Sequence, residues 1–281
     1  MQEIDDYLDQ AKQLPPAPRV LAQLLPLLNQ PDIDVSKVVE LVTYDPALTA
    51  DILQACHTAE QGFATEATHL EEAVVRLGFQ RIYRIVATVC AATTLGAVKP
   101  EWGVDSGELW KHSVTAAFAA QLVARDREVD ENLVFTAGLL HDLGKVVLAG
   151  ALESIYTKVV EEAEAGQYSL LETEERRLGV QHAEVGGRLL ARWALPPELA
   201  AAVCYHHHPA EGEAQPVAAC VCLGDLIAHL VGSRCGCAAY SFLGPVEGMK
   251  LLKLPHDRLP SLITQTLENV AMVEFLLRMN A

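Results

Sequence analysis

The sequence is poor in basic residues and has no long uncharged apolar run. Its 281 residues hold 21 Lys and Arg against 37 Asp and Glu, a formal net charge of −16. Broad nucleic-acid binding needs a basic face that displaces counterions, so this balance argues against nucleic acid as a partner. No run of ~18 uncharged apolar residues occurs, which predicts no membrane span. The start, MQEIDDYLDQ, is acidic and amphipathic, so it does not resemble a signal peptide.

Glycine-rich phosphate loops and oxidising-compartment signals are also missing. Neither G-x-x-x-x-G-K-[ST] nor G-x-G-x-x-G is present. Seven cysteines without a signal peptide indicate reduced thiols in a cytoplasmic protein. The pairs Cys220/Cys222 and Cys235/Cys237 are weak zinc candidates, because C-x-C spacing on a helix points the two side chains to different faces.

The alternating β-branched pattern of strands is sparse, whereas alanine and leucine dominate and 51% of residues are hydrophobic. This composition predicts an all-α protein with a sizeable core. Apolar periodicity and caps predict helices at 20–28, 38–42, 71–77, 82–95, 110–123, 133–140, 146–163, 183–193, 197–205, 217–231 and 259–277. Pro26 should kink or divide the first of these, and Asp45-Pro46 should open a further one.

A Pro- and Gly-containing stretch, residues 96–107, is the predicted boundary between two parts of the chain. We therefore expect an N-terminal helical part, residues 1–100, and a helical bundle, residues 101–281.

The stretch GLLHDLGKVVL places His141, Asp142 and Lys145 in an otherwise apolar run. In one interpretation Gly144 ends a helix, and the basic side chains lie near its negative end. In the other, the polar pair is buried because it holds a metal ion. The tripeptide alone does not decide between them.

Further histidines and one aspartate lie on or at the ends of predicted helices in the same half of the chain. Each has an ordinary explanation, such as a half-buried histidine, a solvated helix end or an ion pair between Asp225 and His229. Taken together, their types are those of a nitrogen and oxygen metal site. A neighbouring His-Asp pair can also bridge two ions ~3.5–4 Å apart, an arrangement used for phosphate-ester hydrolysis. The candidates are His112, His141, Asp142, His182, His206, His207, His208 and Asp225.

The order of these residues resembles the HD superfamily of metal-dependent phosphohydrolases, and most closely its HDOD branch. The stretches LPPAPRVLAQLL, VTYDPALTADIL and LEEAVVRLGF are similar to the N-terminal helices of HDOD domains. GLLHDLGK, QHAEVGGRLLARWALP and YHHHP are similar to the HD-like part. The resemblance implies an N-terminal helical subdomain packed on an HD-type helical bundle.

The resemblance also implies roles for individual residues. His112, His141, Asp142 and Asp225 match the core metal set, whereas His182, His206 and His207 match the extra ligands of members with two ions. Asp142 and Lys145 are the implied catalytic residues, the lysine lying near a substrate phosphate. The expected cofactor is one or two transition-metal ions, from among Fe, Mn, Zn, Ni and Co.

Two functions remain open at this point. The chain is either a cytoplasmic signal-transduction protein that binds a protein partner, or a metal-dependent phosphohydrolase or phosphodiesterase acting on a nucleotide or another small phosphate ester. After the histidine run, PAEGEAQPVAAC lacks the Gly-Tyr-Pro signature of cyclic di-GMP phosphodiesterases, so that reaction is not implied.

Overall fold

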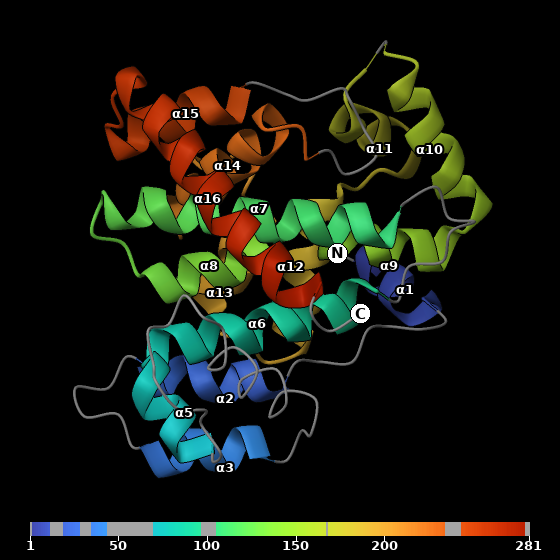
Figure 1. Cartoon of the computed structure of the whole chain (residues 1–281). Helices are drawn as coiled ribbons and strands as arrows, with labels where there is room; N and C mark the ends of the chain where they lie inside the picture. Colours follow the sequence, from blue (N-terminus) through green and yellow to red (C-terminus); the bar gives the residue numbers. More distant parts are fainter. Residues whose placement is uncertain are drawn as a thin grey trace. The chain divides into compact units, whose positions relative to one another are not determined.

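The computed structural model of the protein describes residues 2–11, 19–28, 35–43, 70–96, 105–166, 168–233 and 243–278 (Figure 1). Every regular element in these ranges is helical, which confirms the prediction of an all-α protein. The start signal at Asp45-Pro46 and the pair Cys235/Cys237 lie outside the described residues.

The described helices divide into two compact units, one of residues 18–91 and 271–281 and one of residues 1–17 and 92–270. The predicted boundary at residues 96–107 stays a prediction, because residues 97–104 are outside the described ranges. The smaller unit contains α2 (Arg19–Leu28), α3 (Val35–Thr43), α5 (Leu70–Leu77) and most of α6 (Phe79–Leu95).

Short amphipathic helices form the smaller unit. Helix α2 runs through Pro26 without dividing, because this proline lies in its last turn. Gly78, at φ +77°, ends α5 as predicted and leads directly into α6. Leu24 of α2 and Val42 of α3 are among the buried core residues of the smaller unit.

The larger unit holds the remaining helices, and every residue of the candidate metal site lies in it. They are α1 (Gln2–Gln10), α7 (Ser106–Arg125), α8 (Glu131–Leu140), α9 (Leu143–Leu152), α10 (Ser154–Glu164), α11 (Leu170–Leu178), α12 (His182–Arg192), α13 (Pro197–Cys204), α14 (Gln215–Leu230), α15 (Leu243–Leu252), a short 3₁₀ turn (His256–Arg258) and most of α16 (Leu259–Arg278).

Helices α7 and α14 pack side by side in the core of the larger unit. Both are buried along most of their length, and Asp105 caps the start of α7 by accepting from the Glu108 backbone N–H at 2.9 Å. A side chain at Gly224 would collide with Ala116 and Ala120 of α7, so this glycine permits the close approach of the two helices.

Helices α8 and α9 meet at a sharp turn formed by His141 and Asp142. The interpretation in which Gly144 ends a helix is therefore wrong, because Gly144 lies in the first turn of α9. A Cβ on Gly144 would collide with the backbone carbonyl of His182, so the glycine lets α9 approach the start of α12. The single helix predicted over 146–163 is also wrong, because Glu153, at φ 46°, separates α9 from α10.

The apolar segment Glu131–Leu152 is long and apolar enough to cross a membrane by length and composition, although it is not uncharged, since Asp142 and Lys145 lie in it. Its whole apolar window is buried inside the protein, and the His141-Asp142 turn interrupts it. It therefore has the character of a core segment.

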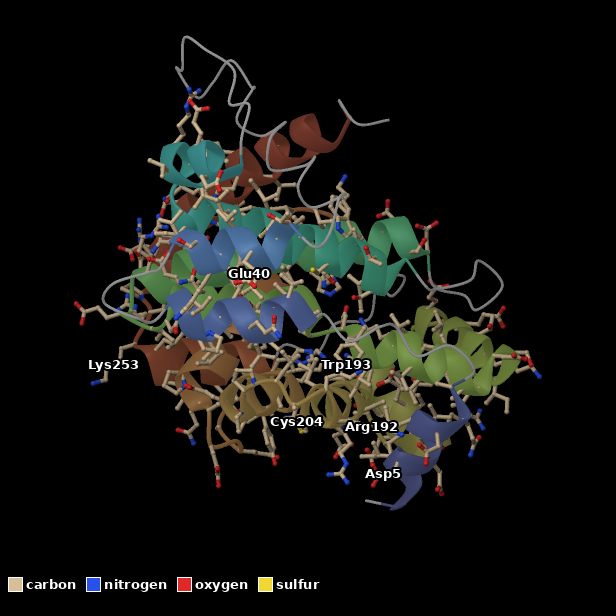
Figure 2. All side chains as sticks on the ribbon, turned by 90° about the horizontal axis from the view of Figure 1, so that it is seen from below. Asp5, Glu40, Arg192, Trp193, Cys204 and Lys253 are labelled. Carbon is tan, nitrogen blue, oxygen red and sulfur yellow. The ribbon has the colours of Figure 1, made fainter. Side chains whose placement is uncertain are left out.

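The N-terminal helix α1 lies against α9 and α12 in the same unit. Asp5 and Asp9 pair with Arg188 and Arg192 of α12 at 2.9 and 2.7 Å. One residue of each pair, Asp5 on α1 and Arg192 on α12, is labelled in Figure 2. Tyr7 donates from its hydroxyl to the Leu178 carbonyl at 3.3 Å. The exposed ion pairs contribute little individually, whereas the buried Leu8 side chain anchors the helix.

Candidate metal centre

The structure brings together seven side chains that the sequence analysis singled out as metal ligands. They come from α7, the α8–α9 turn, the start of α12, the segment after α13, and α14. Six of them are buried and His207 is half-buried. The seven are His112, His141, Asp142, His182, His206, His207 and Asp225.

Three of the imidazoles are oriented by backbone carbonyls. The Nδ1 atoms of His112, His141 and His206 lie 2.7, 2.8 and 2.7 Å from the carbonyl oxygens of Ser233, Gly138 and Val203. A carbonyl can only accept, so Nδ1 carries the proton and Nε2 of the neutral ring presents a lone pair. All three Nε2 atoms are buried without a hydrogen-bond partner. Metal-bound histidines have this arrangement, so the donors fit an ion.

The first group of donors surrounds two carboxylates. Oδ1 of Asp225 lies 3.0 Å from Nε2 of His112 and 3.7 Å from Nε2 of His141. Oδ2 of Asp142 lies 3.7 and 3.5 Å from the same two nitrogens. We call the space among His112, His141, Asp142 and Asp225 the first position.

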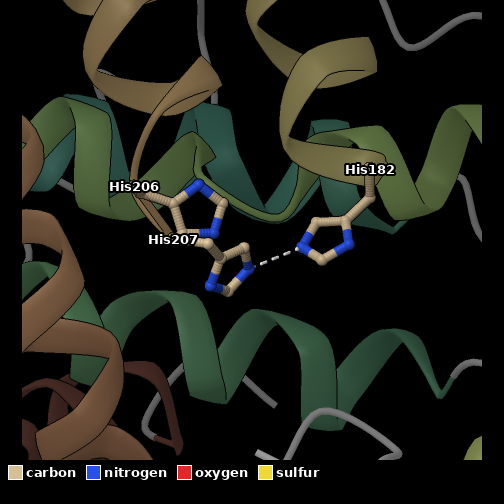
Figure 3. A group of neighbouring side chains, drawn as sticks. All are labelled: His182, His206 and His207. Atoms are coloured by element: carbon tan, nitrogen blue, oxygen red, sulfur yellow. Dashed lines mark hydrogen bonds between the residues drawn. The ribbon is translucent and has the colours of Figure 1, made fainter. Parts of the chain in front are cut away.

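The second group consists of three imidazoles, His182, His206 and His207 (Figure 3). One ligand atom from each lies within 4.8 Å of the others, and Nε2 of His182 is 3.1 Å from Nε2 of His207. Two such nitrogens need a proton or a cation between them, because their lone pairs repel. We call the space among these residues the second position. His206 also groups with His141 and Asp225, so it lies between the two positions.

Asp142 faces both positions with different oxygen atoms. Its Oδ2 is turned toward the first position, and its Oδ1 lies 3.3 Å from Nε2 of His182 in the second. This is the placement that a bridging carboxylate requires. Nζ of Lys145 lies 2.8 Å from Oδ2 and supplies a positive charge beside it.

A buried carboxylate that the sequence analysis missed holds His182 in place. Oε2 of Glu174 accepts from the His182 backbone N–H at 2.9 Å and lies 2.8 Å from His182 Nδ1. Its Oε1 accepts from the Tyr156 hydroxyl at 2.7 Å. A signal existed in the sequence, because Glu174 interrupts the apolar stripe of Leu171 and Leu178 on α11.

Charge interactions in the site oppose the effect of burial on the carboxylates. Burial alone would raise the pKa of Asp142, but His141, Lys145 and His182 hold it well below its usual range. The pKa of Asp225 is likewise held well below its usual range, against burial, by His229, His112 and His141. Both carboxylates are therefore ionised at neutral pH and available to a cation.

The histidines of the second position divide into charged and neutral rings. Burial lowers the pKa of His182, but the Glu174 and Asp142 carboxylates outweigh it and raise the value to about 9. Burial and the neighbouring His141 and His182 lower the pKa of His206 to about 3. Burial and its histidine neighbours also lower the pKa of His207 well below its usual range. In the metal-free protein the second position therefore holds one protonated ring.

Other candidates from the sequence lie apart from these groups. Within the described ranges, His208 belongs to no cluster of potential ligands, and neither do Cys220 and Cys222. Burial raises the pKa of Cys220 to about 12. His229, which the sequence analysis considered only as an ion-pair partner of Asp225, does group with His112 and Asp225.

The profile of the HDOD domain family matches residues 14–209 of the chain. An uncharacterized protein of Treponema pallidum is 28% identical over 205 residues, which are 71% of this chain and 39% of that protein. A ribonuclease Y of Opitutus terrae is 26% identical over 208 residues, 74% of this chain and 32% of the enzyme. The chain thus spans well under half the length of either relative.

Among solved structures, an HDOD domain protein with unknown function from Geobacter sulfurreducens has the same fold. The TM-score is 0.75 at 24% sequence identity, covering 95% of this chain and 88% of that one.

Proposed function

The chain belongs to the HDOD domain family, and on that premise we propose that it is a cytoplasmic signal-transduction protein with a dinuclear HD-type metal centre that hydrolyses a phosphate ester. The observation that carries the proposal is the orientation of the histidines. Backbone carbonyls accept hydrogen bonds from the Nδ1–H groups of His112, His141 and His206, which leaves three buried Nε2 atoms without a hydrogen-bond donor. Such orphaned acceptors are costly unless a cation satisfies them.

Two ions, when bound, would act as Lewis acids and would lower the pKa of a water molecule, which makes that water a better nucleophile. The chain's own residues would hold them: Asp142 with one oxygen toward each position, and the histidines with neutral rings. Lys145 lies beside Asp142, where its ammonium group can pair with a phosphate oxygen and offset the negative charge that develops in the reaction.

The second candidate is a nucleotide phosphodiesterase or phosphohydrolase without a signalling role. The similarity to a ribonuclease Y favours a phosphodiester among the substrates to be tried. The net charge of −16 favours a small ester over a nucleic-acid polymer. A protein partner in a signalling pathway is part of the first candidate only.

The proposal is tested on protein purified without chelator. Its metal content is determined, and Mn, Fe, Zn, Ni and Co are added to metal-depleted protein. The loaded protein is then assayed against phosphomonoesters, nucleotides and dinucleotides. We expect metal-dependent hydrolysis that His141→Ala and Asp142→Ala both abolish, whereas His208→Gln retains it.

Two outcomes contradict parts of the proposal. If the protein binds none of the added metals, the metal centre is wrong. If loaded protein hydrolyses nothing, and a partner binds equally well with and without metal, the site is a relic within a purely regulatory domain.

A further inference from the structure

His229 lies on α14 one turn after Asp225, so both side chains are on the same face of the helix. Its Nε2 is 3.4 Å from Oδ1 of Asp225, and its ring centroid is 4.9 Å from that of His112. Its side chain is 18% exposed, whereas those of His112 and Asp225 are almost fully buried. His229 therefore stands on the solvent side of the first position.

We infer that His229 is a further ligand of the ion at the first position, an inference that rests on the metal centre proposed above. One ligand atom each from His112, Asp225 and His229 lie within 4.8 Å of one another, close enough to share one ion. Two ligands spaced i and i+4 on one helix face are a recurring way to hold a metal.

An ion pair with Asp225 alone explains the position of His229 less well. The 3.4 Å separation is longer than the ~2.7–3.2 Å of an N–H···O hydrogen bond. The same Oδ1 atom already faces His112 at 3.0 Å and His141 at 3.7 Å. A cation held by His112, Asp225 and His229 accounts for the nearness of both imidazoles to this carboxylate oxygen.

With His229 the two positions differ in kind. The first then offers His112, Asp225 and His229 as one group of donors, beside the group of His112, His141 and Asp142. These imidazole nitrogens and carboxylate oxygens suit Mn, Fe, Co or Zn. The second position would be held by His182, His206, His207 and the shared Asp142, so imidazole nitrogens dominate its donors.

The experiment compares wild type with His229→Gln, using Co²⁺ added to metal-depleted protein. Calorimetry gives stoichiometry and affinity, and the visible absorption of bound Co²⁺ gives the coordination number and donor set. We expect His229→Gln to weaken one of two Co²⁺ sites by at least about tenfold, the lower end of what loss of a supporting contact costs. The Co²⁺ spectrum should change with it.

Two further variants separate ligand loss from general damage. His229→Glu replaces the imidazole by another ligand and should restore the tight site with an altered spectrum. His208→Gln, at a histidine outside every candidate ligand group among the described residues, should leave both readouts at wild-type values. Circular dichroism of the metal-depleted proteins checks that all variants are folded.

The outcomes distinguish this inference from the proposed function. If wild type binds two Co²⁺ ions and His229→Gln matches it in affinity and spectrum, His229 is not a ligand and the metal centre stands without it. If wild type binds no Co²⁺, the proposed metal centre itself fails.

Discussion

Replacing Glu174 by glutamine removes one buried negative charge while it keeps the shape of the side chain. The amide oxygen of glutamine can accept the two bonds from His182, and its amino group can donate to the hydroxyl oxygen of Tyr156. The fold should survive. By contrast, Glu174→Ala would strand these buried donors at about 1–3 kcal/mol each and destabilise the protein.

The charge matters because it keeps His182 protonated in the metal-free protein. Burial lowers the pKa of His182, but Glu174 and Asp142 raise it to about 9. At pH ~7.5 the wild-type ring is then almost fully in its imidazolium form, and an ion at the second position must displace the extra proton. Without the Glu174 charge the pKa of His182 falls toward the ordinary value of ~6.5, at which the ring would carry about 0.1 of this proton at pH ~7.5. Glu174→Gln should therefore release fewer protons per metal bound than wild type, by up to about 0.9 if the pKa falls to its ordinary value.

Calorimetry in two buffers of different ionisation enthalpy measures this proton release. The affinity should also fall by about 10–100-fold, the usual cost of losing a partner that orients a ligand. Glu175→Gln, an exposed neighbour on the same helix, is the matched control and should behave as wild type. Equal proton release from Glu174→Gln and wild type would refute the reasoning, because the proton would then not depend on Glu174.

Three further predictions concern the same unit. Asp142→Ala should cause the largest loss of bound metal of any single substitution in the site, measured by elemental analysis, since it removes the bridge and leaves positive charge uncompensated; a variant that kept both ions would contradict the bridging role. The pKa of His182 is raised from 6.5 to about 9, so protonation of this ring stabilises the metal-free protein. The contribution is fully present below pH 6.5 and is lost as the pH rises toward 9. Thermal melting across this range should show the decline in stability, and Glu174→Gln should make the decline smaller. Gly144→Ala should lower the free energy of unfolding by about 1–3 kcal/mol in denaturant unfolding, because the new methyl group meets the His182 carbonyl. Gly248→Ala is the control, because its Cβ would make ordinary contacts. Equal effects of the two substitutions would argue against the close packing of α9 on α12.

Much of the larger unit was predictable because its signals are local. Caps and helical periodicity located α7, α8, α12 and α14 to within a few residues. The ligands could be proposed because polar residues at apolar helix ends are rare without a partner. The order of the motifs along the chain then indicated which of these candidate ligands belong to one site.

What the sequence did not predict depends on contacts between distant segments. The break between α9 and α10 falls at Glu153, which has φ 46°. Glutamate rarely adopts a positive φ, and no glycine or proline stands at this position to signal the break in the sequence. Glu174 could be placed on the apolar stripe of α11, but its contact with His182 depends on how α11 packs against the start of α12. His229 could be placed one turn from Asp225, but its nearness to His112 depends on how α14 lies along α7.

The close packing of α14 along α7 also bears on where the domain can be cut. The family match ends at residue 209, yet α14 begins at Gln215 and carries Asp225 and His229. The Ser233 carbonyl that orients His112 lies beyond it. A fragment trimmed to the matched residues would uncover the apolar flank of α7 and would lose Asp225 of the first position together with His229. The segment recognised by family similarity is thus shorter than the piece of chain that carries the candidate ligands and the carbonyl that orients His112, and studies of an isolated domain need at least the residues through 233.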